Sequence, residues 1–126
     1  MTTLAFLRPQ TVDEAVALLQ EHGDEAKVMT GSTALTIMLR NRLIDPSVLV
    51  SINGVPGLRE IGVTDGVLEL GALATHRTVE RDPAVRGAIP VLAHTFSVVA
   101  NVRVRNAATV GGVVAEADYA SDPPAA

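Results

Sequence analysis

The sequence predicts an α+β fold in two parts, an α/β unit followed by the start of a second α+β subdomain. Apolar strand-like segments alternate with helix-like segments over the first half of the chain, a pattern typical of parallel βαβ units. Further on, an Asp65-Gly66 turn between two apolar runs indicates an antiparallel hairpin. Turn residues at 53–57 mark the boundary between the predicted domains, residues 1–53 and 54–126.

In the first unit, residues 4–6 predict a short strand. Thr11 and Glu14 form a capping box for the helix that follows, and Gly23 ends that helix. Residues 26–29 predict the next strand. Because a helix separates the two strands, we expect them to be parallel.

A second helix is predicted to run as far as Asp45-Pro46, where proline stops it. Arg40 and Arg42 lie among its apolar residues and are interpreted as solvated charges, with steering of an anion as the alternative. Residues 48–52 predict a third strand. The apolar residues of this helix recur at helical spacing and are expected in the core: Leu35, Met38, Leu39 and Leu43.

In the second part, residues 61–63 and 67–70 are the predicted hairpin strands. Thr75 is a candidate N-cap for a short helix. Asp82-Pro83 opens another helical turn, and Pro90 begins the longest helix of this half. These signals predict three helical segments after the hairpin.

Composition narrows the function. The 126 residues are 48% hydrophobic and 19% charged, as in a globular domain, and the formal net charge of −4 argues against a nucleic-acid surface. The absence of cysteine excludes disulfides and thiolate-held iron–sulfur clusters on this chain. Neither a signal peptide nor a membrane span is predicted, so we expect a cytoplasmic protein.

His22, His76 and His94 lack metal-ligand spacing and are expected at the surface or in caps, with His76 facing a cofactor cleft as the alternative.

Two segments have the chemistry of a phosphate site. The hydroxyl-rich turn at 30–33 precedes a predicted helix, whose first N–H groups would be free to meet an anion. The Gly111-Gly112 pair after Thr109 lets backbone N–H groups approach an oxygen-rich ligand, and Asp118 and Asp122 follow as acceptors for sugar hydroxyls. Together they predict a bipartite diphosphate-and-ribose clamp. The alternatives are an ordinary glycine turn and solvated or turn-capping acids. Neither segment is a Rossmann or Walker A motif.

The chain also carries, in order, Phe6-Leu7-Arg8-Pro9, the turn at 30–33, the 53–58 turn, Ala74-Thr75-His76 and the stretch 105–122. On these motifs, over nearly its whole length, the sequence resembles the FAD-binding medium subunit of molybdenum hydroxylases, as in carbon monoxide dehydrogenase and xanthine dehydrogenase. The resemblance implies a two-subdomain FAD-binding fold of the vanillyl-alcohol-oxidase or PCMH type, with FAD extended between the subdomains.

The resemblance also implies an electron-transfer role in an oxidoreductase, with no catalytic residue and no metal ligand on this chain. The flavin would relay electrons from a 2Fe-2S small subunit to an external acceptor, while a molybdopterin-containing large subunit oxidises the substrate. It assigns FAD contacts to the following residues: Thr30, Gly31, Ser32, Thr33, Ala34, Leu35, Thr109, Val110, Gly111, Gly112, Val113, Asp118 and Asp122.

The sequence departs from the family pattern in four ways. Ser32 stands where the family usually has a second glycine, Ala34 where a polar residue is common, and Val113 where an Asn follows the glycine pair. Loss of that amide removes a hydrogen bond worth about 0.5–1.5 kcal/mol. The chain also stops at Ala126, whereas the family continues for more than an equal length. The alternatives to a FAD-binding module are a truncated docking fragment that binds no flavin and a generic nucleotide-phosphate binder.

Overall fold

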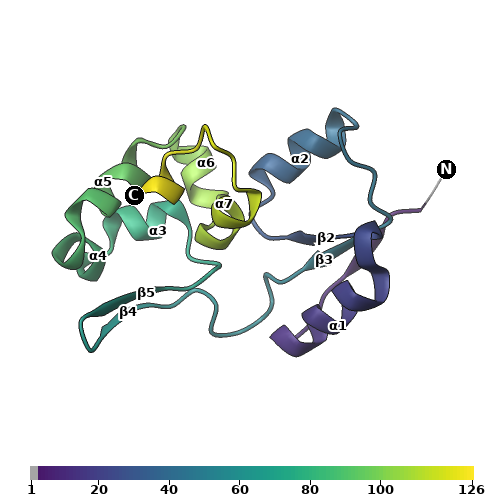
Figure 1. Cartoon of the computed structure of the whole chain (residues 1–126), viewed down its shortest axis with the longest axis horizontal. Coiled ribbons are helices and arrows are strands. Elements are labelled where there is room, and N and C mark those ends of the chain that lie inside the picture. The colour runs from purple at the N-terminus through teal and green to yellow at the C-terminus, as the bar shows by residue number, and fades with distance from the viewer. Residues whose placement is uncertain (1–2) are drawn as a thin grey trace. The chain divides into compact units, whose positions relative to one another are not determined.

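The computed structural model describes residues 3–126, which form two compact units divided between Pro56 and Gly57 (Figure 1). The first unit has parallel strands and helices. The second has an antiparallel hairpin and several short helices. The mixed α+β fold predicted from the sequence is confirmed. Over residues 3–126, no helix has the length and apolar character needed to cross a membrane.

The first unit is built on a three-stranded parallel sheet of order β1-β3-β2, made by Ala5–Leu7, Val48–Ser51 and Ala26–Met29. Strand β3 lies in the middle and pairs with both neighbours, so that Leu49 is opposite Phe6 on one side and Lys27 on the other. All four residues of β3 are buried. The central strand therefore supplies half of the buried residues in this unit's core cluster, Val48 and Val50.

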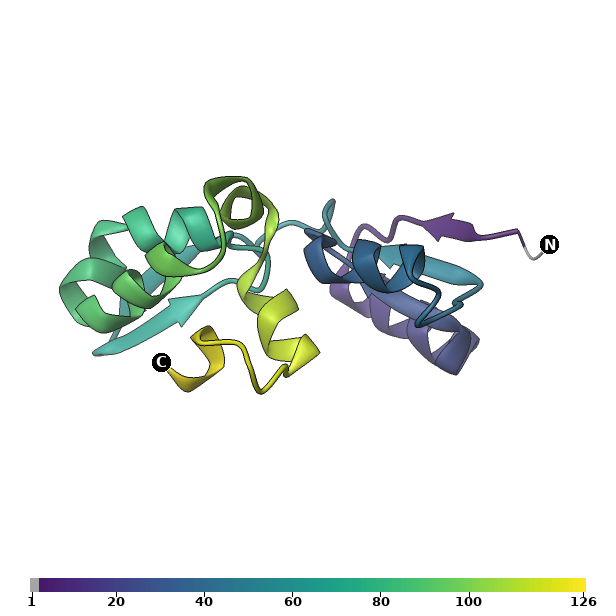
Figure 2. The same cartoon turned by 90° about the horizontal axis from the view of Figure 1, so that it is seen from above.

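Helices α1 (Val12–His22) and α2 (Thr33–Arg40) lie on opposite sides of this sheet (Figures 1 and 2). The α1 side holds the core, where Ala15 packs with residues of β2 and β3. The opposite placement follows from the topology, because β1 to β2 and β2 to β3 step across the sheet in opposite directions and both crossovers are right-handed. The buried members of this core are Ala15, Ala26, Val48 and Val50.

Local signals set the first helix as predicted. The Thr11 hydroxyl accepts a hydrogen bond from the Glu14 N–H at 3.1 Å, and Gly23 ends α1 at φ 52°. The Glu14 carboxylate reaches back to the N–H of Gln10 at 2.7 Å, one residue earlier than an ideal capping box. The strand at 26–29 is also as predicted, while β1 begins one residue later than expected and β3 ends one residue earlier.

Helix α2 differs from the prediction. It ends at Arg40, well before Asp45, because Arg42 adopts a left-handed backbone with φ 54°. No residue of α2 is buried, and Leu43 lies beyond the helix with 70% of its surface exposed. The expectation that its apolar stripe lies in the core is therefore wrong.

The second unit begins with the predicted hairpin, β4 (Ile61–Thr64) and β5 (Val67–Leu70). Asp65 and Gly66 both have positive φ, 51° and 78°, as the two-residue type I′ turn requires. Apolar residues of the hairpin pack on a core cluster from the following segment and helices. The buried members of that cluster are Ala74, Val79, Val85, Ala93 and Phe96.

Three predicted helix starts are confirmed in this unit. Thr75 caps α3 (His76–Arg81), where its hydroxyl accepts from the Thr78 N–H at 3.1 Å. The Asp82 carboxylate caps α4 (Pro83–Ala88), and Pro90 is the first residue of α5 (Pro90–Val98), the longest helix of this unit.

Residues 102–116, for which the sequence predicts no helix, form two short helices, α6 (Val102–Ala107) and α7 (Val110–Glu116). The Asn101 carboxamide oxygen caps α6 by accepting from two backbone N–H groups at 3.0 and 3.1 Å. A final 3-10 turn, η2 (Pro123–Ala125), follows α7. The glycine pair therefore lies inside the first turn of a helix.

Candidate functional site

The first candidate segment, residues 30–32, joins the carboxyl end of β2 to the N-terminus of α2. Ser32 is the N-cap residue in the left-handed region (φ 60°, ψ 21°), and its side chain makes no capping hydrogen bond. The first amides of a helix lack intrahelical acceptors. The N-terminus of α2 thus presents backbone donors that no side chain caps.

Two further features characterise this segment, a buried hydroxyl and a hydrogen bond to Asn53. The Ser32 Oγ is buried and has no hydrogen-bond partner in the described part of the chain. The Asn53 Nδ2 donates to the carbonyl of Thr30 at 3.0 Å, which fixes the segment to the chain just beyond β3. A buried polar atom without a partner is costly in a folded protein. This hydroxyl is therefore suited to donating to an acceptor from outside the chain.

The second candidate segment is the start of α7, and its amides already have acceptors within the chain. The Thr109 hydroxyl accepts from the Gly112 N–H at 3.1 Å, and the Thr109 carbonyl accepts from the Val113 N–H at 3.1 Å. The Val110 N–H donates to a carbonyl of residue 74 at 2.9 Å and the Gly111 N–H to one of residue 72 at 2.8 Å. Thr109 itself is only 5% exposed.

The two candidate acids lie in the exposed chain after α7. The Asp118 Oδ1 accepts from the Ala120 N–H at 2.9 Å, and the backbone carbonyl of Asp122 accepts from the Ala125 N–H at 3.1 Å. Both carboxylates remain open to solvent. Their local contacts are those of residues that shape a turn.

The candidate residues fall into two groups, one in each unit. The structure brings Thr30, at the start of the first segment, next to Asn53, and it brings 109–111 next to 72–76. Within each group the contacts are defined. The bipartite clamp and its individual ligand contacts stay predictions.

A buried charged cluster near Thr109 was not expected from the sequence. The Glu80 side chain, 5% exposed, pairs with Arg77 and with the Arg105 Nε at 3.1 Å. Arg105 also donates from Nη1 to the Val99 carbonyl at 3.0 Å. The cluster ties α3 to α6, the helix that leads directly into the second candidate segment.

His76 lies in the same region and is only 2% exposed, so the expectation of a surface or capping histidine is wrong. Its ring meets Phe96 edge-on, with 4.8 Å between ring centroids and 73° between the planes, and its backbone N–H donates to the Ala108 carbonyl at 2.9 Å. Burial lowers the pKa of His76, and the charge of Arg105 adds to this effect, while a hydrogen bond at the Thr109 backbone opposes it. Sequence alone gave no sign of this burial.

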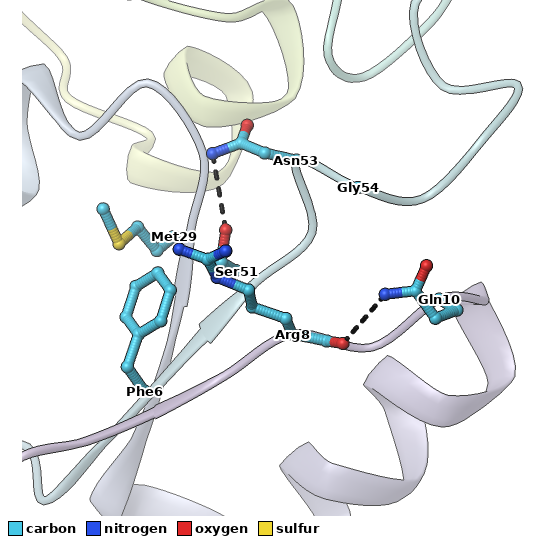
Figure 3. A pocket seen from close by; sticks show the side chains of 7 residues that line it. All are labelled: Phe6, Arg8, Gln10, Met29, Ser51, Asn53 and Gly54. Atoms are coloured by element: carbon cyan, nitrogen blue, oxygen red, sulfur yellow. Dashed lines mark hydrogen bonds between the residues drawn. The ribbon is translucent and has the colours of Figure 1, made fainter.

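A pocket of about 460 Å³ lies in the first unit at the carboxyl ends of its strands (Figure 3). The guanidinium of Arg8 stands 5.1 Å from the centroid of the Phe6 ring. These residues were not predicted from the sequence as a site, although residues directly after parallel strands are frequent ligand contacts. The pocket is lined by Phe6, Arg8, Gln10, Met29, Ser51, Asn53 and Gly54.

Comparison with known proteins identifies the fold family. Residues 2–126 match the family described as FAD binding domain in molybdopterin dehydrogenase. The chain belongs to this family. The resemblance to medium subunits of molybdenum hydroxylases is thereby confirmed, and this FAD-binding domain corresponds to their N-terminal portion.

Curated relatives support the assignment. The domain is 36% identical over 119 residues to the 6-hydroxypseudooxynicotine dehydrogenase complex subunit alpha of Paenarthrobacter nicotinovorans, covering 94% of this chain and 40% of that protein. It is 35% identical over 117 residues to the carbon monoxide dehydrogenase medium chain of Hydrogenophaga pseudoflava, covering 93% and 41%. The chain thus spans about two fifths of the length of these relatives.

Solved structures share the fold. Carbon monoxide dehydrogenase from Hydrogenophaga pseudoflava superimposes with a TM-score of 0.95 at 34% identity, covering 98% of this chain and 43% of that one. Quinoline 2-oxidoreductase from Pseudomonas putida 86 gives a TM-score of 0.92 at 33% identity, covering 97% and 42%. The FAD-binding domain therefore shares the backbone of these enzymes over nearly its whole length.

Proposed function

We propose that this domain binds FAD and holds the FAD diphosphate at the N-terminus of α2. The observation that carries the proposal is the open helix start, where Ser32 leaves the first amides of α2 without a side-chain cap. Helix N-termini attract anions through these free amides and the helix dipole. The family assignment makes FAD the ligand to test first.

The residues of the first segment suit a diphosphate. The buried Ser32 Oγ, which has no partner in the described chain, is a donor for a phosphate oxygen. The segment contains no acidic residue that would repel the ligand. The proposed diphosphate contacts are Thr30, Gly31, Ser32, Thr33, Ala34 and Leu35.

The second segment is proposed as a further contact with a different character. The amides of residues 110–113 donate within the chain, so the proposed contribution of this segment is a close approach of its glycine backbone to the ligand. The exposed carboxylates of Asp118 and Asp122 would accept hydrogen bonds from ribose hydroxyls. The proposed contacts of this segment are Thr109, Val110, Gly111, Gly112, Val113, Asp118 and Asp122.

We further propose that the domain serves electron transfer in a multisubunit oxidoreductase of the cytoplasm. The relatives are named as subunits or medium chains of dehydrogenases, which supports a role alongside other chains. A 2Fe-2S subunit and a molybdopterin subunit are the proposed partners. Bound FAD would supply the redox chemistry, while the residues of this chain bind and orient it.

Substituting Thr33 tests the proposal. Thr33→Asp places a negative charge at the start of α2, where it favours the helix but repels a diphosphate. Thr33→Asn is the neutral control of similar size. We expect the Asp variant to bind FAD roughly tenfold or more weakly, a loss of about 1.4 kcal/mol per factor of ten, with the Asn variant close to the parent chain. Flavin fluorescence titration measures the affinities, and thermal unfolding checks that both variants fold.

The same titration separates the alternatives. A parent chain that binds no FAD, or a Thr33→Asp variant that binds as tightly as the parent, contradicts the proposed site. Equal affinity for ADP and FAD indicates a generic nucleotide binder. A folded chain that binds neither ligand but is retained by the partner subunits indicates a docking fragment.

A further inference from the structure

We propose that the pocket of the first unit is a subsite for a phosphate and its neighbouring sugar or ribityl hydroxyls, with Arg8 as the anion ligand. This inference rests on the proposed FAD function and adds a site that continues from the α2 N-terminus. It concerns only residues of the first unit. Arg8 and Ser51 are the residues on which it depends most.

The topology places the pocket where open parallel sheets bind ligands. Chain segments leave β1 and β2 toward helices on opposite sides of the sheet, and the carboxyl end of β3 lies between them (Figures 1 and 2). A reversal of this kind leaves a crevice outside the carboxyl ends of the strands. Phe6 and Arg8 come from the end of β1, Met29 from β2 and Ser51 from β3.

The side chains of the pocket select an anion. Arg8 is the one charged residue in its lining, and no carboxylate lines it. Guanidinium groups bind phosphate through two parallel hydrogen bonds and keep their charge at all physiological pH values. In a chain with a formal net charge of −4, Arg8 gives this pocket a local positive charge that attracts a phosphate.

The remaining walls favour hydroxyl groups over a flat ring. The guanidinium of Arg8 already covers the Phe6 ring at 5.1 Å, which takes up the aromatic face of the pocket (Figure 3). Ser51 is 6% exposed, and its hydroxyl lies 3.4 Å from the Asn53 Nδ2. Gln10 adds a further amide to the lining. These groups hydrogen-bond polyols and sugars.

Asn53 connects the pocket to the diphosphate segment. Its Nδ2 donates to the Thr30 carbonyl at 3.0 Å and also lies near Ser51, so one side chain contacts both places. A ligand with one phosphate of its diphosphate at the start of α2 can therefore place the other phosphate toward Arg8. The hydroxyls of the neighbouring ribose or ribityl chain of FAD then enter the pocket.

Charge substitution at Arg8 tests the subsite. Arg8→Gln removes the cation, Arg8→Lys keeps a charge without the planar fork, and Arg40→Gln is a control with the same net charge as Arg8→Gln at a residue outside the pocket lining. Titrations use FAD, ADP, FMN, riboflavin and adenosine. We expect Arg8→Gln to weaken FAD binding about tenfold, because hydrogen bonds to charged groups contribute roughly 1.5–3 kcal/mol. The FAD affinity of Arg8→Lys should lie between those of Arg8→Gln and the parent chain. Arg40→Gln should change FAD affinity by less than about twofold, since exposed charges contribute little.

The ligand arms identify which half of FAD enters the pocket. Weaker binding of ADP but not FMN to Arg8→Gln assigns the adenosine side, and the reverse assigns the ribityl side. Riboflavin and adenosine lack phosphate, so their affinities should be the same in Arg8→Gln and the parent chain. Equal FAD affinity in Arg8→Gln and Arg40→Gln overturns the subsite. If Thr33→Asp still weakens FAD binding as expected, the proposed FAD function stands. A parent chain that binds no FAD overturns both.

An NMR titration of the unaltered chain covers the case in which Arg8→Gln does not fold. Adding FAD should shift the Arg8 Nε–H signal and the Ser51 and Asn53 amide signals together. Signals of α2 that move while these three stay fixed would contradict the subsite.

Discussion

Gly111 lies against Ala72 so closely that a methyl group does not fit between them. The Gly111 N–H donates to the Ala72 carbonyl at 2.8 Å, and a Cβ added to Gly111 would stand 2.8 Å from the Ala72 Cβ and 2.9 Å from its carbonyl oxygen. Packing within the unit therefore accounts for the glycine, whether or not a ligand also approaches it. This contact holds the start of α7 against the segment before α3.

The contact predicts the effect of Gly111→Ala. The added methyl group must displace backbone, which typically costs about 1–3 kcal/mol. We expect the free energy of unfolding of the second unit to fall by this amount, measured by native-state amide hydrogen exchange. Gly87→Ala is the control, because Gly87 is in α4 with no atom near its added Cβ. It should gain roughly 0.5–1 kcal/mol from better helix propensity. Equal effects of the two substitutions would contradict the close contact.

Ser32 predicts a stabilising substitution. Its left-handed backbone costs a non-glycine residue about 1–2 kcal/mol, and its buried hydroxyl has no partner in the described chain. Ser32→Gly removes both costs and loses about 0.5–1 kcal/mol through the greater freedom of the unfolded chain. We expect a net gain near 1 kcal/mol in the first unit, read from hydrogen exchange at Val50. Ser32→Ala keeps the backbone strain and should gain less, so a larger gain for alanine than for glycine would contradict this explanation.

His76 predicts a loss of stability in mild acid. Its folded-state pKa is lowered chiefly by burial, so the unfolded chain binds the proton more readily. Stability from this residue is complete above the unfolded pKa of about 6.5 and declines as the pH falls below it. Urea unfolding of the second unit between about pH 8 and 5 measures the slope. His76→Gln should reduce the slope. An unchanged slope in His76→Gln would assign the acid sensitivity to other groups.

Replacing the buried Glu80 carboxylate by a neutral amide should cause a large loss of stability. Glu80→Gln leaves the Arg105 guanidinium, whose side chain is 15% exposed, without its carboxylate. Removing one partner of a buried ion pair costs about 3–5 kcal/mol. We expect a loss near the lower end, because Arg105 keeps its backbone acceptors. The exposed Glu69→Gln should change stability by less than about 0.5 kcal/mol. A double substitution of Glu80 and Arg105 by Met should recover much of the loss, and failure to recover would argue against an unpaired charge as the cause.

Predictions from the sequence were confirmed where interactions within a few residues determine the structure. Thr11 and Asp82 cap helices through their own side chains, and Asp65-Gly66 forms the type I′ turn that its residues favour. The βαβ pattern was also enough to predict parallel strands. These features depend on local backbone preferences and on apolar periodicity, which the sequence displays directly.

Predictions from the sequence were wrong where contacts between segments distant in the chain determine the local structure. The glycine pair disfavours a helix by about 1 kcal/mol per residue, yet α7 forms because Thr109 caps it and the segment before α3 accepts its first amides. The end of α2 at Arg40 depends on one left-handed residue inside an apolar pattern that continues to Leu43. The candidate diphosphate segment was visible as a strand-to-helix turn. The pocket at Arg8 was not, because its walls come from three separate strands.

The central position of β3 also determines when the parallel sheet can form during synthesis. Strands β1 and β2 pair only with β3, and never with each other. Residues 3–47 therefore contain no two strands that pair with each other in this sheet, and neither of its ladders can form until Val48–Ser51 has left the ribosome. Since distant pairings form slowly, the nascent segment carries an unfinished apolar surface during this interval. This interval ends when a single four-residue strand becomes available to both neighbours.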